Sequence, residues 1–117
     1  MDKLEEIART RQKSHARLVG LKSKVCAAFL EMQKVAYEDG ALAKRYKELT
    51  AVGISVAIEC ESCMQWHIEQ TAAAGASFEE ILEAIEVAIE IGGGPATVSA
   101  RFALEALDSV IKPSRGY

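Results

Sequence analysis

The chain has 117 residues, of which half are hydrophobic and only 6% are aromatic, so it suits one compact domain with a core of small aliphatic side chains. Its formal net charge of −3, with bases and acids interspersed, excludes the basic surface that attracts a nucleic-acid backbone. Residues 1–6 are too acidic to begin a secretory signal, and the most apolar run, residues 51–58, is far shorter than the roughly 20 residues of a membrane-spanning helix. We therefore expect one soluble, cytoplasmic domain over residues 1–117, without a nucleic-acid or membrane partner.

Residues 4–37 carry apolar side chains at helical spacing, and charged side chains fill the remaining faces. We expect one or two helices here, with a division at Gly20 or within the polar residues 10–14. Residues 38–40 predict a break, in which Gly40 is suited to the left-handed conformation that ends a helix.

The chain contains three cysteines, an odd number that does not resemble the disulfide framework of a small secreted domain. In a reducing cytoplasm, the close pair Cys60 and Cys63 is typical of a catalytic or metal-binding site. Cys26 is interpreted as a small buried hydrophobe, because nothing near it in the sequence would activate its thiol. His15 lies among polar and basic residues and is interpreted as a solvated surface side chain.

Residues 43–58 predict a helix that is central to the fold, because the sequence becomes almost wholly apolar after Lys47. Glu48 is the acid at the edge of this apolar segment. The residues alone favour a surface ion pair with Lys44, four positions earlier, whereas burial would raise the pKa of the Glu48 carboxyl group. The face expected to be buried carries Tyr46, Leu49, Gly53 and Val56, beside an adjacent face with Glu48, Val52 and Ser55.

Three further helices are expected in the second half of the chain. The first begins near Cys60, and Ser77 with Glu80 then forms a predicted capping box for the second. The second helix stops at the glycine triplet 92–94, which we interpret as a tight turn rather than a phosphate-binding loop. Pro95 opens the third. Since no strand pattern or internal repeat is present, we predict an all-α, single-domain bundle of five or six helices.

Residues 60–67 carry the motif on which the chemistry of the chain is expected to depend. Cys60, Cys63 and His67 are three and four positions apart, so on a helix they share one inward-facing stripe. A dithiol and a base would then point in the same direction. The opposite side of this helix is expected to carry Glu61, Gln65, Glu69 and Gln70.

Three chemistries use two thiols beside an imidazole. In thiol redox, a thiolate attacks an electrophilic sulfur or a peroxide oxygen and the second cysteine resolves the product, with His67 as the base and Glu48 orienting it. In a zinc site, two thiolates and one imidazole are good ligands, but the sequence offers no fourth ligand. In the structural alternative, the cysteines and the histidine only fill the core. The in-line histidine favours redox chemistry, and the other two alternatives stay open.

The pattern Glu48-x(11)-Cys60-x-x-Cys63-x-x-x-His67, continued by residues 74–77 and 92–96, resembles the carboxymuconolactone decarboxylase family in its alkylhydroperoxidase D-like branch. The resemblance covers roughly residues 40–106. It implies an all-helical fold that assembles as trimers or hexamers, and a peroxidase-type activity that reduces hydroperoxides. The natural reductant is not implied. We expect a small-molecule hydroperoxide and an unidentified thiol or lipoyl-type reductant as partners. No cofactor or metal is implied. An oligomer also agrees with the many apolar residues on several faces of short helices.

The resemblance also implies a role for each residue of the motif. Cys63 would attack the peroxide, Cys60 would resolve the product as a disulfide, and His67 with Glu48 would relay protons through a water molecule. Ser62 departs from the pattern, because the type enzyme of the branch has a histidine there, so proton transfer is expected to be slower or to pass through water. The helix dipole favours Cys60 as the more acidic thiol, yet we favour Cys63 because His67 is one turn away. The alternatives are a general protein or lipoyl disulfide oxidoreductase and a non-catalytic zinc-binding oligomer.

Overall fold

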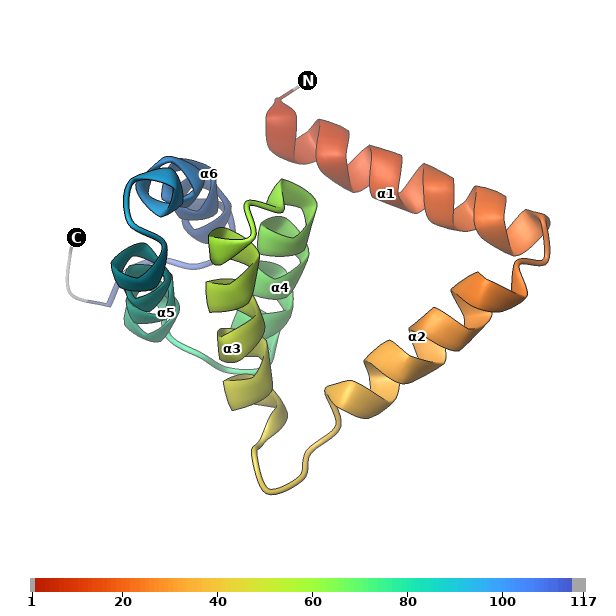
Figure 1. The fold of residues 1–117 in the computed structure, drawn as a ribbon, viewed down its shortest axis with the longest axis horizontal. Helices are drawn as coiled ribbons and strands as arrows, with labels where there is room; N and C mark the ends of the chain where they lie inside the picture. Colours follow the sequence, from red (N-terminus) through yellow and green to blue (C-terminus); the bar gives the residue numbers. More distant parts are fainter. Residues whose placement is uncertain (1, 115–117) are drawn as a thin grey trace.

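The computed structural model describes residues 2–114. These residues form six helices and no strand (Figure 1). The prediction of an all-α fold with five or six helices is confirmed. Among the described residues, no helix combines the length and the apolar character needed to span a membrane. In chain order the helices are α1 (Lys3–Gly20), α2 (Lys24–Ala36), α3 (Lys44–Ala57), α4 (Glu61–Ala73), α5 (Phe78–Gly92) and α6 (Gly94–Val110).

The hydrophobic core lies between the last four helices. Helices α3 and α4 pack against each other, and α5 and α6 pack against both and close the other side (Figure 1). Burying one large aliphatic side chain contributes about 1.5–3 kcal/mol, so the few that fill this core hold α3 and α4 in a fixed relation. The large side chains that are almost completely buried here are Val52, Val56, Met64, Ile68, Ile81, Ile85 and Leu107.

The inward faces of α3 and α4 differ from the predicted ones. On α3 the buried residues include Glu48, Val52 and Ser55, whereas Tyr46 is 45% exposed. Val56 of the predicted face is buried as expected, so the core takes this residue together with the adjacent face, and the prediction is wrong for Tyr46. On α4, Gln65 had been expected to face solvent but is buried, because α1 packs across this side of the helix.

Helices α1 and α2 form an arm that leaves the four-helix core (Figure 1). Of the two positions left open for the division, the chain divides at Gly20, and Lys22 turns it in a left-handed conformation with φ +56°. Neither helix contains a buried residue. Cys26 is accordingly half-buried, so its interpretation as a buried hydrophobe is wrong.

The other turns follow local rules with one exception. The capping box of Ser77 and Glu80 is confirmed, and Gly93 at φ +66° joins α5 to α6. The prediction that Gly40 adopts a left-handed conformation is wrong, since α2 has already ended at Ala36 and Gly40 lies in the following loop. There the Tyr37 N–H donates to the Gln33 carbonyl and closes the helix without a left-handed residue.

Candidate redox site

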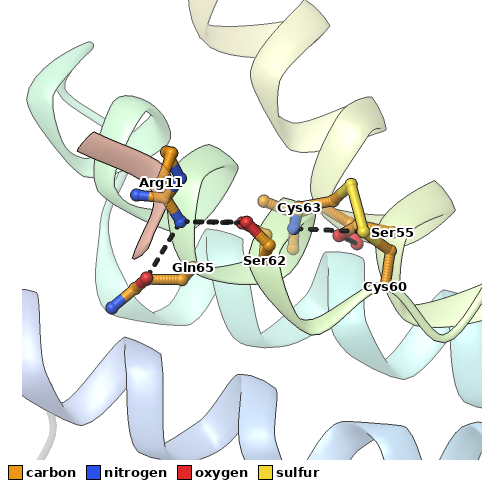
Figure 2. The surroundings of a disulfide bond; sticks show 7 residues. Arg11, Ser55, Cys60, Ser62, Cys63 and Gln65 are labelled. Carbon is orange, nitrogen blue, oxygen red and sulfur yellow. Dashed lines mark hydrogen bonds between the residues drawn. A yellow bond between two sulfur atoms is a disulfide. The ribbon is translucent and has the colours of Figure 1, made fainter. Parts of the chain in front are cut away.

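Cys60 is placed by the tight turn between α3 and α4. The Cys60 N–H donates to the Ser55 carbonyl at 3.0 Å, and Glu59 adopts a left-handed φ of +60°. Cys60 therefore precedes α4 as its N-cap, and its Sγ accepts the N–H of Cys63 at 3.3 Å (Figure 2). The expectation that Cys60 lies on the helical stripe itself is wrong, because the turn places it one residue before the helix begins.

Cys60 and Cys63 are joined by a disulfide bond (Figure 2). Their Cα atoms are 5.2 Å apart, which lies within the usual range for a disulfide. Both residues are half-buried. Cys60 at the N-cap and Cys63 in the first turn of α4 thus bring the two sulfur atoms together.

Glu48 and His67 form the second part of the site. The Oε1 atom of Glu48 lies 2.7 Å from Nδ1 of His67, and its Oε2 atom accepts from Nζ of Lys44 at 3.0 Å. Glu48 is only 2% exposed, and the His67 side chain is 14% exposed. The ion pair with Lys44 is therefore present as predicted, but its interpretation as a surface pair is wrong. The carboxylate is buried and bridges the lysine and the imidazole.

The contact with Glu48 determines the tautomer of His67. A carboxylate oxygen only accepts hydrogen bonds, so Nδ1 of the neutral imidazole must carry the hydrogen. The lone pair then remains on Nε2. The Thr71 hydroxyl donates to the backbone carbonyl of His67 and adds a contact within the same turns of α4. This arrangement leaves Nε2 free to accept a proton from a reacting group.

Tyr37 is a part of the site that the sequence did not indicate. Its ring centroid lies 5.3 Å from that of His67, and Nζ of Lys44 lies 5.6 Å from the Tyr37 ring centroid. Burial raises the pKa of the Tyr37 phenol, and the negative charge of Glu48 raises it further. Tyr37 therefore stays neutral at the pH values at which a thiol reacts.

A groove of about 670 Å³ connects the two parts of the site. Cys63 and His67 both line it, whereas Cys60 does not. Within residues 2–114 no hydrogen bond joins Cys63 to His67 in this disulfide form, so the groove is what the two side chains share. No group of three or more His, Cys, Asp or Glu side chains among these residues is arranged to hold a metal ion.

Arg11 is a second residue that sequence reasoning did not find. One of its guanidinium nitrogens, Nη2, donates to the Ser62 carbonyl at 3.1 Å and to Oε1 of Gln65 at 2.9 Å (Figure 2). These contacts join α1 to the start of α4 across about fifty residues of sequence. No local pattern could have indicated them, because Arg11 lies among many charged residues of similar spacing.

Comparison with known proteins gives one family. Residues 24–106 match the model of the carboxymuconolactone decarboxylase family. An uncharacterized protein of the cox locus of Paracoccus denitrificans is 42% identical over 83 residues, which cover 71% of this chain and 75% of that protein. An uncharacterized protein of Cupriavidus necator is 36% identical over 84 residues, with coverage of 72% and 74%.

Solved structures agree with this match. The apo form of a carboxymuconolactone decarboxylase family protein from Legionella pneumophila is 32% identical, with a TM-score of 0.89 and coverage of 96% of this chain and 100% of that chain. A family protein from Thermotoga maritima, for which a part in the antioxidative response has been suggested, is 26% identical with a TM-score of 0.79. That alignment covers 89% of this chain and 88% of the other.

Proposed function

Since the chain belongs to the carboxymuconolactone decarboxylase family, we propose that it is a thiol-dependent peroxidase that reduces hydroperoxides at Cys63. The observation that carries this proposal is the Cys60–Cys63 disulfide beside the Glu48–His67 pair. The antioxidative role suggested for the Thermotoga maritima neighbour also supports a peroxidase. Lactone decarboxylation would not need a redox-active pair of cysteines.

The first half of the proposed cycle consumes the peroxide. Nε2 of His67 accepts the proton of the Cys63 thiol, and the resulting thiolate attacks the terminal oxygen of the hydroperoxide. A sulfur–oxygen bond forms as the O–O bond breaks, so Cys63 becomes a sulfenic acid and an alkoxide leaves. The alkoxide takes the proton from His67 and departs as the alcohol. Because Cys63 and His67 line the same groove, one bound peroxide can meet both groups.

The second half restores a closed disulfide. The Cys60 sulfur attacks the Cys63 sulfur, the S–S bond forms, and the sulfenic oxygen leaves with the Cys60 proton as water. An external dithiol, of the small thiol or lipoyl type, then supplies two electrons and two protons and returns both cysteines to thiols. The balance is one hydroperoxide and one dithiol converted to one alcohol, one water and one disulfide.

Glu48 and Lys44 act in this scheme through His67 rather than on the peroxide. Glu48 fixes Nδ1 as the protonated nitrogen and stabilises the imidazolium that forms when Cys63 loses its proton. Lys44 binds the other carboxylate oxygen and holds Glu48 in this orientation. Ser62 supplies no second imidazole, so the proposed proton transfers rely on His67 and on water.

A second candidate is general disulfide exchange with protein or lipoyl thiols. It is favoured by the position of Cys60 as N-cap of α4, where the Cys63 N–H and the helix dipole stabilise a thiolate on Cys60. In that case Cys60 would be the attacking sulfur and a peroxide would not be needed. The two candidates differ in which cysteine is essential for the first step.

Peroxide consumption and mass spectrometry together test the proposal. One equivalent of hydroperoxide added to the reduced protein is expected to give a Cys60–Cys63 disulfide with Cys26 still a free thiol. Cys63→Ser is expected to abolish peroxide consumption, whereas Cys60→Ser should accumulate the sulfenic acid on Cys63. Cys26→Ser is the matched control and should react like the unmodified protein.

The result that contradicts the peroxidase is equally specific. If Cys63→Ser still consumes peroxide at the original rate, the assignment is wrong. If Cys60→Ser alone abolishes exchange with insulin or a lipoyl substrate, and no variant reacts with peroxide, general disulfide exchange replaces it. Glu48→Gln is expected to slow the peroxide reaction by about 10- to 100-fold, and the exposed Glu83→Gln should not.

A further inference from the structure

The groove that reaches Cys63 has an apolar wall and a cationic end. We infer that it takes an organic hydroperoxide with a compact apolar body and a carboxylate, and that Arg11 recognises this carboxylate. Only one part of this inference, the peroxide group of the substrate, rests on the proposed function. The recognition of an apolar carboxylate depends only on the groove and can be measured without turnover.

The size and lining of the groove favour an organic substrate. Its volume of about 670 Å³ lies in the range of small-molecule sites, whereas a molecule the size of water or hydrogen peroxide fills only a few tens of Å³. Phe29 and Leu30 from α2 and Trp66 from α4 supply an apolar wall that hydrogen peroxide could not use. An aromatic or branched aliphatic body would exclude water from these three side chains.

Arg11 is held in place before any ligand arrives. Its Nη2 atom is used by Ser62 and Gln65, and the Gln65 side chain is itself buried and donates to the Leu4 carbonyl at 2.8 Å. The guanidinium carbon also lies 5.4 Å from the Trp66 ring centroid. Among the described residues, Nε and Nη1 have no hydrogen-bond partner. A fixed guanidinium with free donors is the geometry that binds a carboxylate well.

The charges around the groove also favour an anion. Its lining includes Arg11 and His15 and no acidic residue. Glu48 lies behind His67, with both of its oxygens already bonded to Lys44 and His67. A carboxylate in the groove therefore meets one permanent positive charge and no neighbouring negative charge among the lining residues.

The position of Arg11 limits the length of the substrate. Arg11 contacts the carbonyl of Ser62, the residue directly before Cys63 (Figure 2). A carboxylate bound to Arg11 would therefore lie close to the thiol that attacks the peroxide. A substrate with a single benzene ring between the carboxylate and the hydroperoxide carbon is short and rigid, and its ring can contact Trp66, which lines the groove.

A binding experiment tests the groove without any redox step. Trp66 is the one tryptophan of the chain and lines the groove, so its fluorescence reports occupancy. We expect para-isopropylbenzoate to bind at least about tenfold more tightly than its neutral amide, since a charge-assisted hydrogen bond separates them. Arg11→Met should remove this difference, and Arg9→Met, an exposed change on the same helix, should keep it.

Turnover provides the second test. The para-carboxylate of cumene hydroperoxide is expected to have a kcat/KM at least about tenfold above that of cumene hydroperoxide itself. In Arg11→Met the ratio of the two kcat/KM values should fall to about one, because only the carboxylate loses its partner. An equal loss for the carboxylate, cumene hydroperoxide and hydrogen peroxide would overturn the inference, because Arg11 would then only support the turn around Ser62.

The two proposals fail in different ways. If the unmodified protein binds the carboxylate and the amide equally and reduces all three peroxides with equal efficiency, the groove assignment is wrong and the peroxidase stands. If the carboxylate preference in binding is present but no peroxide is reduced, the peroxidase is wrong and the groove assignment stands. Both comparisons use the unmodified protein, so they remain decisive even if Arg11→Met does not fold.

Discussion

Glu48 is the residue whose surroundings best explain the candidate site. Removing a carboxylate from water costs several kcal/mol unless its oxygens are paired, and here one oxygen is bonded to Lys44 and the other to His67. The lysine is one helical turn earlier on α3, so the charge and its partner are placed by the same helix. Removing either partner would leave one oxygen of the buried carboxylate without its hydrogen bond while the other oxygen keeps its own.

The phenol of Tyr37 gives a pH-dependent test of this buried charge. Its pKa is raised from 10.0 first by burial and then by Glu48, so the folded protein keeps the proton to a higher pH than the unfolded chain does. The unfolded state then binds fewer protons, and the free energy of unfolding should fall as the pH rises from 10 through the raised pKa. Tyr37→Phe should remove this part of the fall.

The measurement is the ultraviolet absorbance of tyrosinate in the unmodified protein minus that in Tyr37→Phe. The difference should titrate above the ordinary tyrosine pKa, and Glu48→Gln should move it down because the nearby negative charge is lost. A difference curve that follows the ordinary pKa would show that Tyr37 is not buried beside Glu48 in solution.

At the scale of the helices, local signals predicted much and left out the contacts between distant elements. The capping box of Ser77 and Glu80 marks the start of α5 because its hydrogen bonds join neighbouring residues. The twelve-residue offset between Glu48 and Cys60 indicated the proposed proton relay only through the family resemblance. The contact of Arg11 with Ser62 depends on how α1 crosses α4, which no short window of sequence determines.

Local sequence was also a poor guide to which residues adopt a left-handed conformation in the turns. Gly40 was predicted to be left-handed, but Lys22 and Glu59 occupy that conformation without being glycine. A glycine signals that a left-handed conformation is permitted, whereas the length of the connection decides where one is required. The connection between α3 and α4 is so short that Glu59 must take this conformation for the Cys60 N–H to reach the Ser55 carbonyl.

This turn carries a prediction about stability. A non-glycine residue in the left-handed region costs about 1–2 kcal/mol, so Glu59→Gly is expected to raise the free energy of unfolding by about 0.5–1 kcal/mol after the added chain entropy of glycine is counted. Glu59→Ala is the matched control, since it removes the same side chain but keeps the strain. Urea denaturation measures the free energy of unfolding of both variants. A glycine variant that is no more stable than the alanine variant would contradict this prediction.

At the scale of the whole molecule, the arm of α1 and α2 leaves an unusually large surface uncovered. The chain exposes 7505 Å², whereas a compact monomer of 12.7 kDa is expected to expose about 6,200 Å². The excess of about 1,300 Å² exceeds the roughly 800 Å² that each partner contributes to a standard protein interface. The radius of gyration of 14.8 Å is likewise larger than the about 13 Å expected for this length.

Helix α2 carries apolar side chains that the groove does not use. Phe29 and Leu30 line the groove, while Val25 and Met32, which we call the outer face of α2, are not part of its lining and are 81% and 60% exposed. We expect a second copy of the chain to cover this outer face, which agrees with the oligomers that the family resemblance implies. The mass in solution, measured by light scattering after size exclusion, should therefore be a multiple of 12.7 kDa.

Charges on the outer face should break this assembly. Val25→Glu combined with Met32→Glu changes the net charge by −2 and would bury two unpaired carboxylates at the interface, so the measured mass should fall toward 12.7 kDa. Arg101→Glu, an exposed change on α6 with the same effect on net charge, should leave the mass unchanged. The groove residues are untouched in both variants, so fluorescence of Trp66 with para-isopropylbenzoate can be read in parallel. If the unmodified chain already has the mass of a monomer, the outer face of α2 needs another explanation than self-association.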